Sequence, residues 1–364
     1  MDGTVELREV AATFCRDGRI CPIERLGEGN INDTYLVRSA DATLVLQNIN
    51  AEVFPEPRRV IDNFVRITGH LKKKQKETGL IFLIAEPVRT LTGELYHRDS
   101  RGGFWRGQTY LAGSHAGNSS QENWFVRVGR TLGRFHLLAA DLDVAQLAEP
   151  LPGFHHLPGY MDEFDLIVAK KPREMDADGR YCLESIARVR PMTNILDDAR
   201  AAGILAVQPF HGDPKIDNFI FSASGDGMLD FDTVGGGLIH YDLGDCLRSC
   251  CNRAGEKGRD ASAVSFDLTC CRALLEGYFS GGVFLAEKQR NLIFEAVYLI
   301  TFELGVRFFT DHLRGNSYFR VAKDGDNLAR AVRQFRLAEN IAAKEQEIRR
   351  ILSEAGNQKP DASL

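Results

Sequence analysis

The sequence predicts an α+β fold in two lobes, a small antiparallel sheet with one main helix followed by a larger, mostly helical part. Apolar and polar residues alternate at period two before residue 50, as in Tyr35 and Val37 and again in Leu44 and Leu46. Beyond residue 119, apolar residues recur at helical spacing over several long segments. A chain of 364 residues is long enough for roughly two such units.

The first lobe is expected to span residues 1–107. A helix is expected over 1–19, three strands between 23 and 50, and a further helix opened by Pro55 and Pro57 that ends near Glu77. Further strands are expected in the segments LIFLIAEPVRT, GELYHRDS and GGFWRGQTYL. The small, polar stretch AGSHAGNS completes a hinge that we place at 108–119.

The second lobe is expected over residues 120–356, with a flexible tail at 357–364. Its helical periodicity is clearest in four segments: NWFVRVGRTLGRFHLLAADL, SFDLTCCRALLEGYF, AEKQRNLIFEAVYLITFELGVRFFTDHL and NLARAVRQFRLAENIAAKEQEIRRILSEA. The last segment carries enough charge to lie on the surface.

Composition excludes several functional classes. Lys and Arg total 45 and Asp and Glu total 50, a net charge of −5, so nucleic acid is not expected as a partner. The N-terminus has no signal-peptide pattern, and the apolar run Leu292–Phe309 contains Glu295, Glu303 and Arg307, which argues for a buried helix rather than a membrane span. We therefore expect a cytoplasmic protein without a membrane partner, and a monomer.

The eight cysteines are expected to be reduced, buried thiols. Zinc is the alternative, because Cys246 and Cys250 are one helical turn apart and two Cys-Cys pairs occur. The sequence has no C-x-x-C motif, so plain core cysteines are the favoured interpretation.

The most informative stretch is FHGDPKIDNFIF, residues 210–221, followed by LDFDTV. Gly212 and Pro214 predict a loop, and FIFSA and MLDFD predict a hairpin that brings Asp213, Asn218 and Asp230 together. The two oxygen-bearing ligands Asn218 and Asp230 suit Mg²⁺, and the carboxylate of Asp213 suits a base for a hydroxyl nucleophile. Each residue alone is better explained by a polar turn, whereas the three together, with a glycine loop upstream, favour a site.

A second polar stretch, LGEGNINDTY, lies between two expected strands. Gly27 and Gly29 allow backbone N–H groups to approach phosphates closely, and Asn32 and Thr34 add side-chain donors. Alone, this pattern also fits an ordinary glycine hairpin. Beside the HGDPKIDN motif, it indicates a loop over nucleotide phosphates.

These motifs resemble the aminoglycoside phosphotransferase and choline kinase family, which has a protein-kinase-like fold. The resemblance covers nearly the whole chain, and GEGNINDTYLV, LQNINAEVFPE, DFDTVGGGLIHYDLGDCLR and ELGVRFFTDHLRGNSYF resemble the N-acetylhexosamine 1-kinases in particular. It implies ATP as phosphate donor, Asp213 as catalytic base and Mg²⁺ on Asn218 and Asp230. It also implies an adenine-binding hinge at Gln108, Tyr110 and Leu111.

Two positions depart from the family pattern, Gln47 and Asn30, and Asn30 stands where the N-acetylhexosamine 1-kinases have a histidine near the sugar. The third strand, LVLQNIN, has Gln47 where a phosphate-binding lysine is expected. An amide donates to phosphate without bringing a charge. We therefore expect either weaker nucleotide binding or a cation supplied from elsewhere.

The acceptor end is less defined by sequence. We interpret Asp245 first as a structural residue and second as a residue that contacts the substrate. Tyr318 is a further candidate for substrate contact. Arg307 shares a helix face with Glu303 and Asp311, which fits a buried ion-pair ladder and a sugar-binding arginine equally. The leading hypothesis is phosphorylation of a sugar hydroxyl, the anomeric 1-OH of N-acetylglucosamine or N-acetylgalactosamine. The alternatives are another hydroxyl acceptor (another sugar, an amino alcohol or an aminoglycoside) and a non-catalytic nucleotide-binding module.

Overall fold

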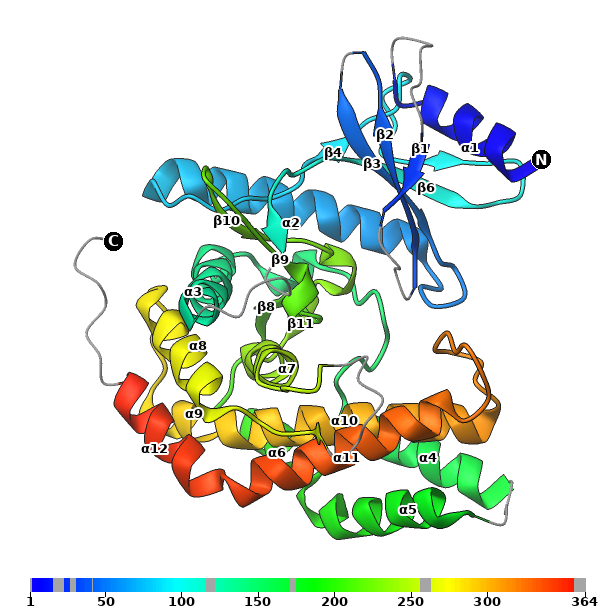
Figure 1. Ribbon diagram of the computed structural model, residues 1–364. Helices are drawn as coiled ribbons and strands as arrows, with labels where there is room; N and C mark the ends of the chain where they lie inside the picture. Colours follow the sequence, from blue (N-terminus) through cyan, green and yellow to red (C-terminus); the bar gives the residue numbers. More distant parts are fainter. Residues whose placement is uncertain are drawn as a thin grey trace.

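The computed structural model describes residues 2–15, 23–26, 31–40, 42–115, 122–170, 175–255 and 263–356. Gly27, Gly29 and the expected tail at 357–364 lie outside these ranges. Figure 1 shows the sheet with α1 and α2 above the helical part, and a small hairpin between them. Within the described residues, no helix combines the length and apolar character needed to cross a bilayer.

The N-terminal sheet is antiparallel, in the order β1-β2-β3-β6-β4, with β5 pairing with β6. Thr34 lies opposite Gln47, and Gln47 lies opposite Arg106, so three polar side chains form one row across the sheet. The strands are Ile23–Arg25 (β1), Asp33–Arg38 (β2), Thr43–Ile49 (β3), Pro87–Val88 (β4), His97–Arg98 (β5) and Phe104–Thr109 (β6).

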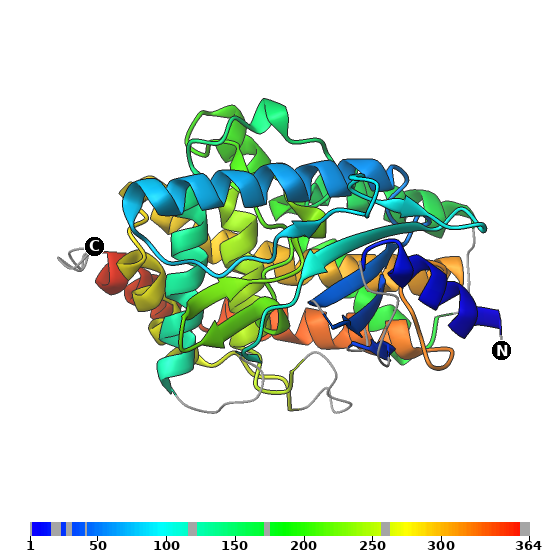
Figure 2. The ribbon, with the colours of Figure 1, turned by 90° about the horizontal axis from the view of Figure 1, so that it is seen from above.

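Two helices accompany this sheet. α1, Asp2–Ala12, is shorter than expected, and α2, Pro57–Thr78, confirms the predicted helix. Pro57 occupies the first turn of α2, where its missing N–H costs nothing, and Gly79 ends the helix with a φ of 75°. The predicted apolar face of α2 is buried. Figure 2 shows α2 running across the top of the molecule.

The segment 80–90 was expected to be a strand and is mostly irregular, with only β4 at its end. Leu83 explains the difference, because its N–H donates to the carbonyl of Asp226 at 2.8 Å, in the second lobe. Its backbone therefore connects the two lobes instead of extending the sheet. Likewise, only β5 forms in the expected strand 93–100.

The second lobe is mainly helical, as predicted, but its segmentation differs. Two long periodic segments are each split, at Leu292 and at Lys344, and the region 157–201 contains three helices that were not predicted. The helices are Glu122–Ala139 (α3), Leu157–Lys170 (α4), Ala177–Val189 (α5), Ile195–Ala201 (α6), Ile239–Cys250 (α7), Leu268–Ser280 (α8), Glu287–Asn291 (α9), Ile293–Arg314 (α10), Asp326–Ala343 (α11) and Glu345–Gly356 (α12).

Short strands at the lobe boundary carry the central motif. Gln208–Phe210 (β8) pairs with Gly235–Gly237 (β11), and a sheet of three strands has the order β10-β9-β7. β7, Ser114–His115, falls in the segment expected to be only a hinge. The predicted strand MLDFD is wrong in position, because Gly225–Met228 (β10) pairs with Phe219–Ser222 (β9) and ends before the two aspartates.

Candidate active site

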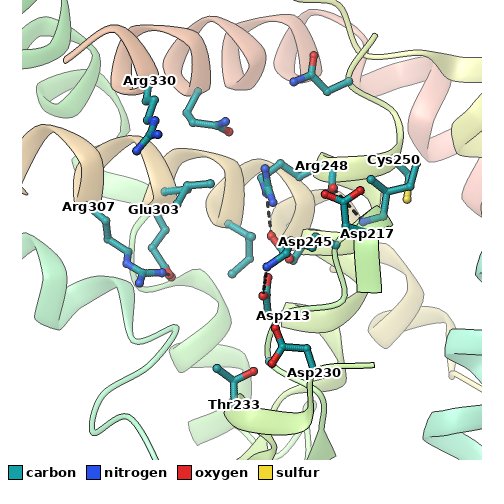
Figure 3. A pocket seen from close by; sticks show the side chains of 18 of the residues that line it. Asp213, Asp217, Asp230, Thr233, Asp245, Arg248, Cys250, Glu303, Arg307 and Arg330 are labelled. Atoms are coloured by element: carbon teal, nitrogen blue, oxygen red, sulfur yellow. Dashed lines mark hydrogen bonds and ion pairs between the residues drawn. The ribbon is translucent and has the colours of Figure 1, made fainter. Parts of the chain in front are cut away.

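A cavity of about 750 Å³ is lined by residues of both lobes. Asn32, Thr34 and Gln47 line it from the sheet, and the HGDPKIDN loop lines it from the second lobe. Figure 3 shows Asp213, Asp230 and Asp245 gathered at one part of this cavity, with Arg307 and Arg330 at another. Most of the site residues expected from sequence therefore face one space.

The HGDPKIDN loop is held by a buried carboxylate on α7. Asp242 accepts hydrogen bonds from the backbone N–H groups of His211 at 2.6 Å and Gly212 at 2.7 Å. His136 makes a further hydrogen bond to Asp242 at 2.9 Å, so this histidine is a buried residue with a satisfied ring nitrogen. Gly212 has a φ of 88°, and a Cβ there would lie 2.8 Å from the Thr233 carbonyl oxygen. The loop conformation therefore requires a glycine at that position.

Asp213 follows this fixed backbone directly. Its Oδ2 accepts a hydrogen bond from the Lys215 ammonium at 2.5 Å, and the Asn218 amide donates to its carbonyl oxygen at 2.8 Å. Burial acts to raise the pKa of Asp213, but the charge and hydrogen bond of Lys215, together with smaller contributions from His211 and Arg248, lower it overall. The carboxylate is therefore ionised at neutral pH and can accept a proton from a hydroxyl group.

Asp230 lies just after β10 in the left-handed region, with a φ of 62°. Burial, and then the nearby charge of Asp232, raise its pKa to about 7. The raised pKa shows that the surrounding side chains do not compensate the negative charge at Asp230. A bound dication would supply the compensating positive charge. The carboxylate of Asp230 and the amide oxygen of Asn218 are hard oxygen donors and fit Mg²⁺.

The described residues contain no group of three or more His, Cys, Asp or Glu side chains able to hold a metal ion. A divalent ion here would therefore need the Asn218 amide and non-protein oxygens to complete its shell. The described cysteines from Cys182 onward are free thiols, and Cys246 and Cys250 have their sulfur atoms 3.9 Å apart.

Gln47 belongs to a buried polar network. Its Oε1 accepts two hydrogen bonds from Arg106, from Nε at 3.1 Å and Nη2 at 2.7 Å. Its Nε2 therefore faces away from Arg106, and it donates to the Thr34 hydroxyl at 3.2 Å. Arg106 also pairs with Asp232, which in turn accepts a hydrogen bond from Asn32.

A buried cation thus lies beside Gln47 on the adjacent strand, paired with Asp232 and outside the lining of the cavity. Arg106 stands opposite Gln47 in β6, and its guanidinium lies 4.9 Å over the Phe64 ring of α2. Sequence reasoning did not find it. The alternation of β6 fixes the face that Arg106 occupies, but only the pairing of β3 with β6 places it beside Gln47.

The expected hinge residues do not line the cavity. Gln108 is paired with Val45 in the sheet, Tyr110 is exposed after the end of β6, and Leu111 packs against the main core. Their expected contact with adenine has no support in the cavity lining and stays a prediction.

Three ion pairs lie at the acceptor end among the described residues. Arg248 donates to Asp245 at 2.8 Å, and both side chains are buried. Burial keeps the pKa of Asp245 raised although Arg248 acts in the opposite direction. His155 donates from Nδ1 to Glu303 at 3.0 Å, and this glutamate lies 3.8 Å from Arg307.

The expected ion-pair ladder on α10 is therefore only half formed. Asp311 instead accepts backbone hydrogen bonds from the loop after α10, including those from Tyr318 and Phe319 at 2.9 Å each. This capping holds Tyr318 against the cavity. Arg307 lies over four aromatic rings, at 5.0 Å from Tyr160 and 5.8 Å from Tyr318 for two of them.

The fold is similar to solved structures of several small-molecule kinases. An aminoglycoside phosphotransferase from Alicyclobacillus acidocaldarius is 15% identical with a TM-score of 0.64, covering 95% of this chain and 96% of that chain. A choline/ethanolamine kinase family protein from Mesorhizobium loti is 19% identical with a TM-score of 0.56, covering 98% and 99%. An amicoumacin kinase in complex with AMP-PNP and Ca²⁺ is 14% identical with a TM-score of 0.58, covering 94% and 96%.

These likenesses establish the two-lobed, protein-kinase-like fold. The family model described as the phosphotransferase enzyme family matches residues 22–274, which is more than half of the chain. The chain therefore belongs to the phosphotransferase enzyme family and is a kinase that transfers phosphate to a hydroxyl group of a small molecule.

Proposed function

We propose that this protein is an ATP- and Mg²⁺-dependent sugar kinase acting on the anomeric 1-OH of an N-acetylhexosamine. The observation that carries the kinase part is the ionised Asp213, which lines one cavity together with Asp230, while the amide of Asn218 donates to the Asp213 backbone just behind this wall. The two lobes meet at this cavity, so a nucleotide under the sheet and an acceptor against α10 share one space. The acceptor identity rests on the sequence resemblance and on Arg307 and Tyr318 in the lining.

Asp213 performs the proton chemistry. Its carboxylate accepts a hydrogen bond from the acceptor hydroxyl and receives the proton as the hydroxyl oxygen bonds to the γ-phosphorus. The bond from that phosphorus to the β–γ bridging oxygen breaks, and ADP leaves. A carboxylate with a lowered pKa is a weak base, so its main contribution is orientation, in keeping with the loose transition state of phosphoryl transfer.

Asn218 and Asp230 would hold Mg²⁺. When bound, this ion neutralises part of the negative charge of the phosphates. Asn32, Thr34 and Gln47 would donate hydrogen bonds to the phosphates, with Gly27 and Gly29 providing backbone N–H groups above them. Adenine would lie against the hinge at Gln108, Tyr110 and Leu111.

We also propose that the lobes correspond to residues 1–107 and 120–356, and that the protein acts as a monomer in the cytoplasm, where ATP is supplied.

The test is an ADP-release assay with a panel of hydroxyl acceptors, with product analysis by ³¹P NMR. We expect acceptor-dependent ADP release with N-acetylglucosamine or N-acetylgalactosamine and a product phosphorylated at the anomeric carbon. Phosphorylation of a different hydroxyl would refute the acceptor but keep the kinase. Mg²⁺-dependent thermal stabilisation by ATP without phosphorylation of any acceptor would favour a non-catalytic nucleotide-binding module.

A further inference from the structure

The wall that α10 and α11 contribute to the cavity is basic. It contains three arginines, Arg307, Arg330 and Arg333, and one acid, Glu303. Figure 3 shows Arg330 reaching down from α11 towards Arg307 of α10. None of these arginines lies among the residues proposed to bind the nucleotide phosphates, which are Asn32, Thr34 and Gln47.

Glu303 does not neutralise this wall, because it is already engaged. His155 is bound on both ring nitrogens, with Nδ1 to Glu303 at 3.0 Å and Nε2 to the Gly212 carbonyl oxygen at 2.8 Å. Neither acceptor has a proton to give, so both nitrogens donate and the ring is an imidazolium. Burial acts to lower the pKa of His155, but Glu303 raises it overall. One carboxylate thus serves His155 and Arg307 together.

Arg330 and Arg333 have no acid partner in the part of the chain that the structure describes, where no carboxylate lies within 4.0 Å of either guanidinium. Arg330 donates only to neutral oxygens, of the Arg320 carbonyl at 3.0 Å and the Asn327 amide at 3.1 Å. Asp326, in the first turn of the same helix, accepts backbone hydrogen bonds instead. Burial, and then the charge of Arg330, lower the pKa of Arg333.

A second, independent observation comes from Gln334. This side chain lines the cavity and is 5% exposed, and its Oε1 has no hydrogen-bond partner among the described residues. A buried amide without a partner is costly, and a ligand group in the cavity would satisfy it.

Two aromatic rings hold the guanidinium groups in place. Phe308 and Phe319 lie with their centroids 4.5 Å apart, Arg330 lies 5.5 Å over Phe308 and Arg307 lies 5.6 Å over Phe319. Stacking fixes the faces of the two guanidinium groups and leaves N–H edges for a ligand. The two arginines thereby converge on one region.

We propose that the preferred form of the sugar acceptor carries an anionic group, a carboxylate or a phosphate monoester, in addition to the hydroxyl that is phosphorylated, and that Arg307, Arg330 and Arg333 bind this group, so that neutral sugars are weaker acceptors. The inference rests on the proposed function, because it names the substrate class of that same site. Desolvated cations without a partner are unfavourable, and a planar guanidinium matches the two oxygens of a carboxylate or phosphate. A cationic amino alcohol or aminoglycoside would be repelled at this end.

The test is calorimetric binding of two matched sugar pairs in the presence of AMP-PNP and Mg²⁺. One pair is N-acetylglucosamine and its 6-phosphate, and the other is glucose and glucuronic acid. We expect an anionic member to bind at least about tenfold more tightly than its neutral counterpart. The two pairs distinguish a phosphate from a carboxylate.

The key variant is Arg333→Gln, because Arg333 makes no hydrogen bond or ion pair in the described part of the chain, so we expect the variant to keep the thermal stability of the unaltered protein. This change should reduce the preference for the anionic sugar by about tenfold and leave the neutral sugar unaffected. Arg336→Gln is the matched control, since Arg336 is exposed on the same helix and stacks on Tyr181 at 5.0 Å.

Equal affinity within both pairs, absence of binding by all four sugars, or a preference that survives Arg333→Gln would overturn the proposal. Its failure is separable from failure of the proposed function. If the protein phosphorylates neutral sugars but does not bind anionic ones, only the anionic subsite is refuted. If it binds anionic sugars but releases no ADP with any of them, the proposed kinase activity on a sugar acceptor is refuted.

Discussion

Replacing Gln47 with lysine restores the residue expected on the third strand, yet the structure predicts that it damages the protein. Gln47 is 8% exposed and Arg106 is 1% exposed. The amide oxygen accepts both hydrogen bonds that Arg106 directs at β3. A lysine ammonium can accept neither, and it brings a second positive charge to the same place.

The size of the destabilisation by Gln47→Lys follows from these contacts. Two unit charges about 4 Å apart repel by about 4 kcal/mol at an effective dielectric constant of about 20. Losing the acceptor of a charged donor costs a further 1.5–3 kcal/mol, roughly. Asp232 already pairs with Arg106, so it offsets part of the added charge, and the flexible lysine stem relieves another part. We expect Gln47→Lys to lower the free energy of unfolding by about 3–6 kcal/mol.

Gln47→Met is the matched control, because it removes the acceptor without adding charge and should cost about 1.5–3 kcal/mol. Urea unfolding measures both variants. ATP affinity by calorimetry should fall at least about fivefold in both variants. Gln47→Met loses the amide donor to the phosphates, and in Gln47→Lys the ammonium is repelled by Arg106 from the position that the amide occupied. Lysine and methionine variants of equal stability, or tighter ATP binding by Gln47→Lys, would refute the reasoning.

Three further results are expected. Asp213→Asn should lower kcat by at least about 10²-fold with little change in ATP affinity, and near-normal turnover would exclude Asp213 as the base. Asp230→Ala should raise the Mg²⁺ concentration needed for activity more than Asn218→Ala does, because it removes a full charge. If Asp230→Ala left this Mg²⁺ concentration unchanged, the metal site would have to be moved to Asp232. Burial lowers the pKa of His240 to about 4 from 6.5, so the unfolded chain binds the proton more tightly and stability falls as pH drops from about 6.5 to 4. The free energy of unfolding can be measured with urea at pH 7.5 and at pH 4.5. His240→Gln should make the decrease between these two pH values about 2–3 kcal/mol smaller than in the unaltered protein. An unchanged decrease would contradict the burial of His240 as a neutral ring.

Sequence alone predicted the parts of this protein that depend on local pattern. The helix Pro57–Thr78 follows from its apolar spacing and from the proline at its start, and β3 follows from alternation around Gln47. The HGDPKIDN motif and the following aspartates were identified together because each lies within about 20 residues of the others, on one hairpin. The resemblance to a kinase family gave the two-lobed fold.

Only the tertiary structure decided what depends on contacts between distant segments. Leu83 was expected in a strand but bonds to the second lobe, and the strand expected at MLDFD ends early because β9 and β10 set a different register. Arg106 lies 59 residues from Gln47 and 126 from Asp232, so no local pattern could place this cation in the nucleotide end. The arginines of α10 and α11 likewise appear as ordinary charges of amphipathic helices until packing turns them to one cavity. Local patterns fix which face of an element is polar, whereas the pairing of elements decides which polar faces meet.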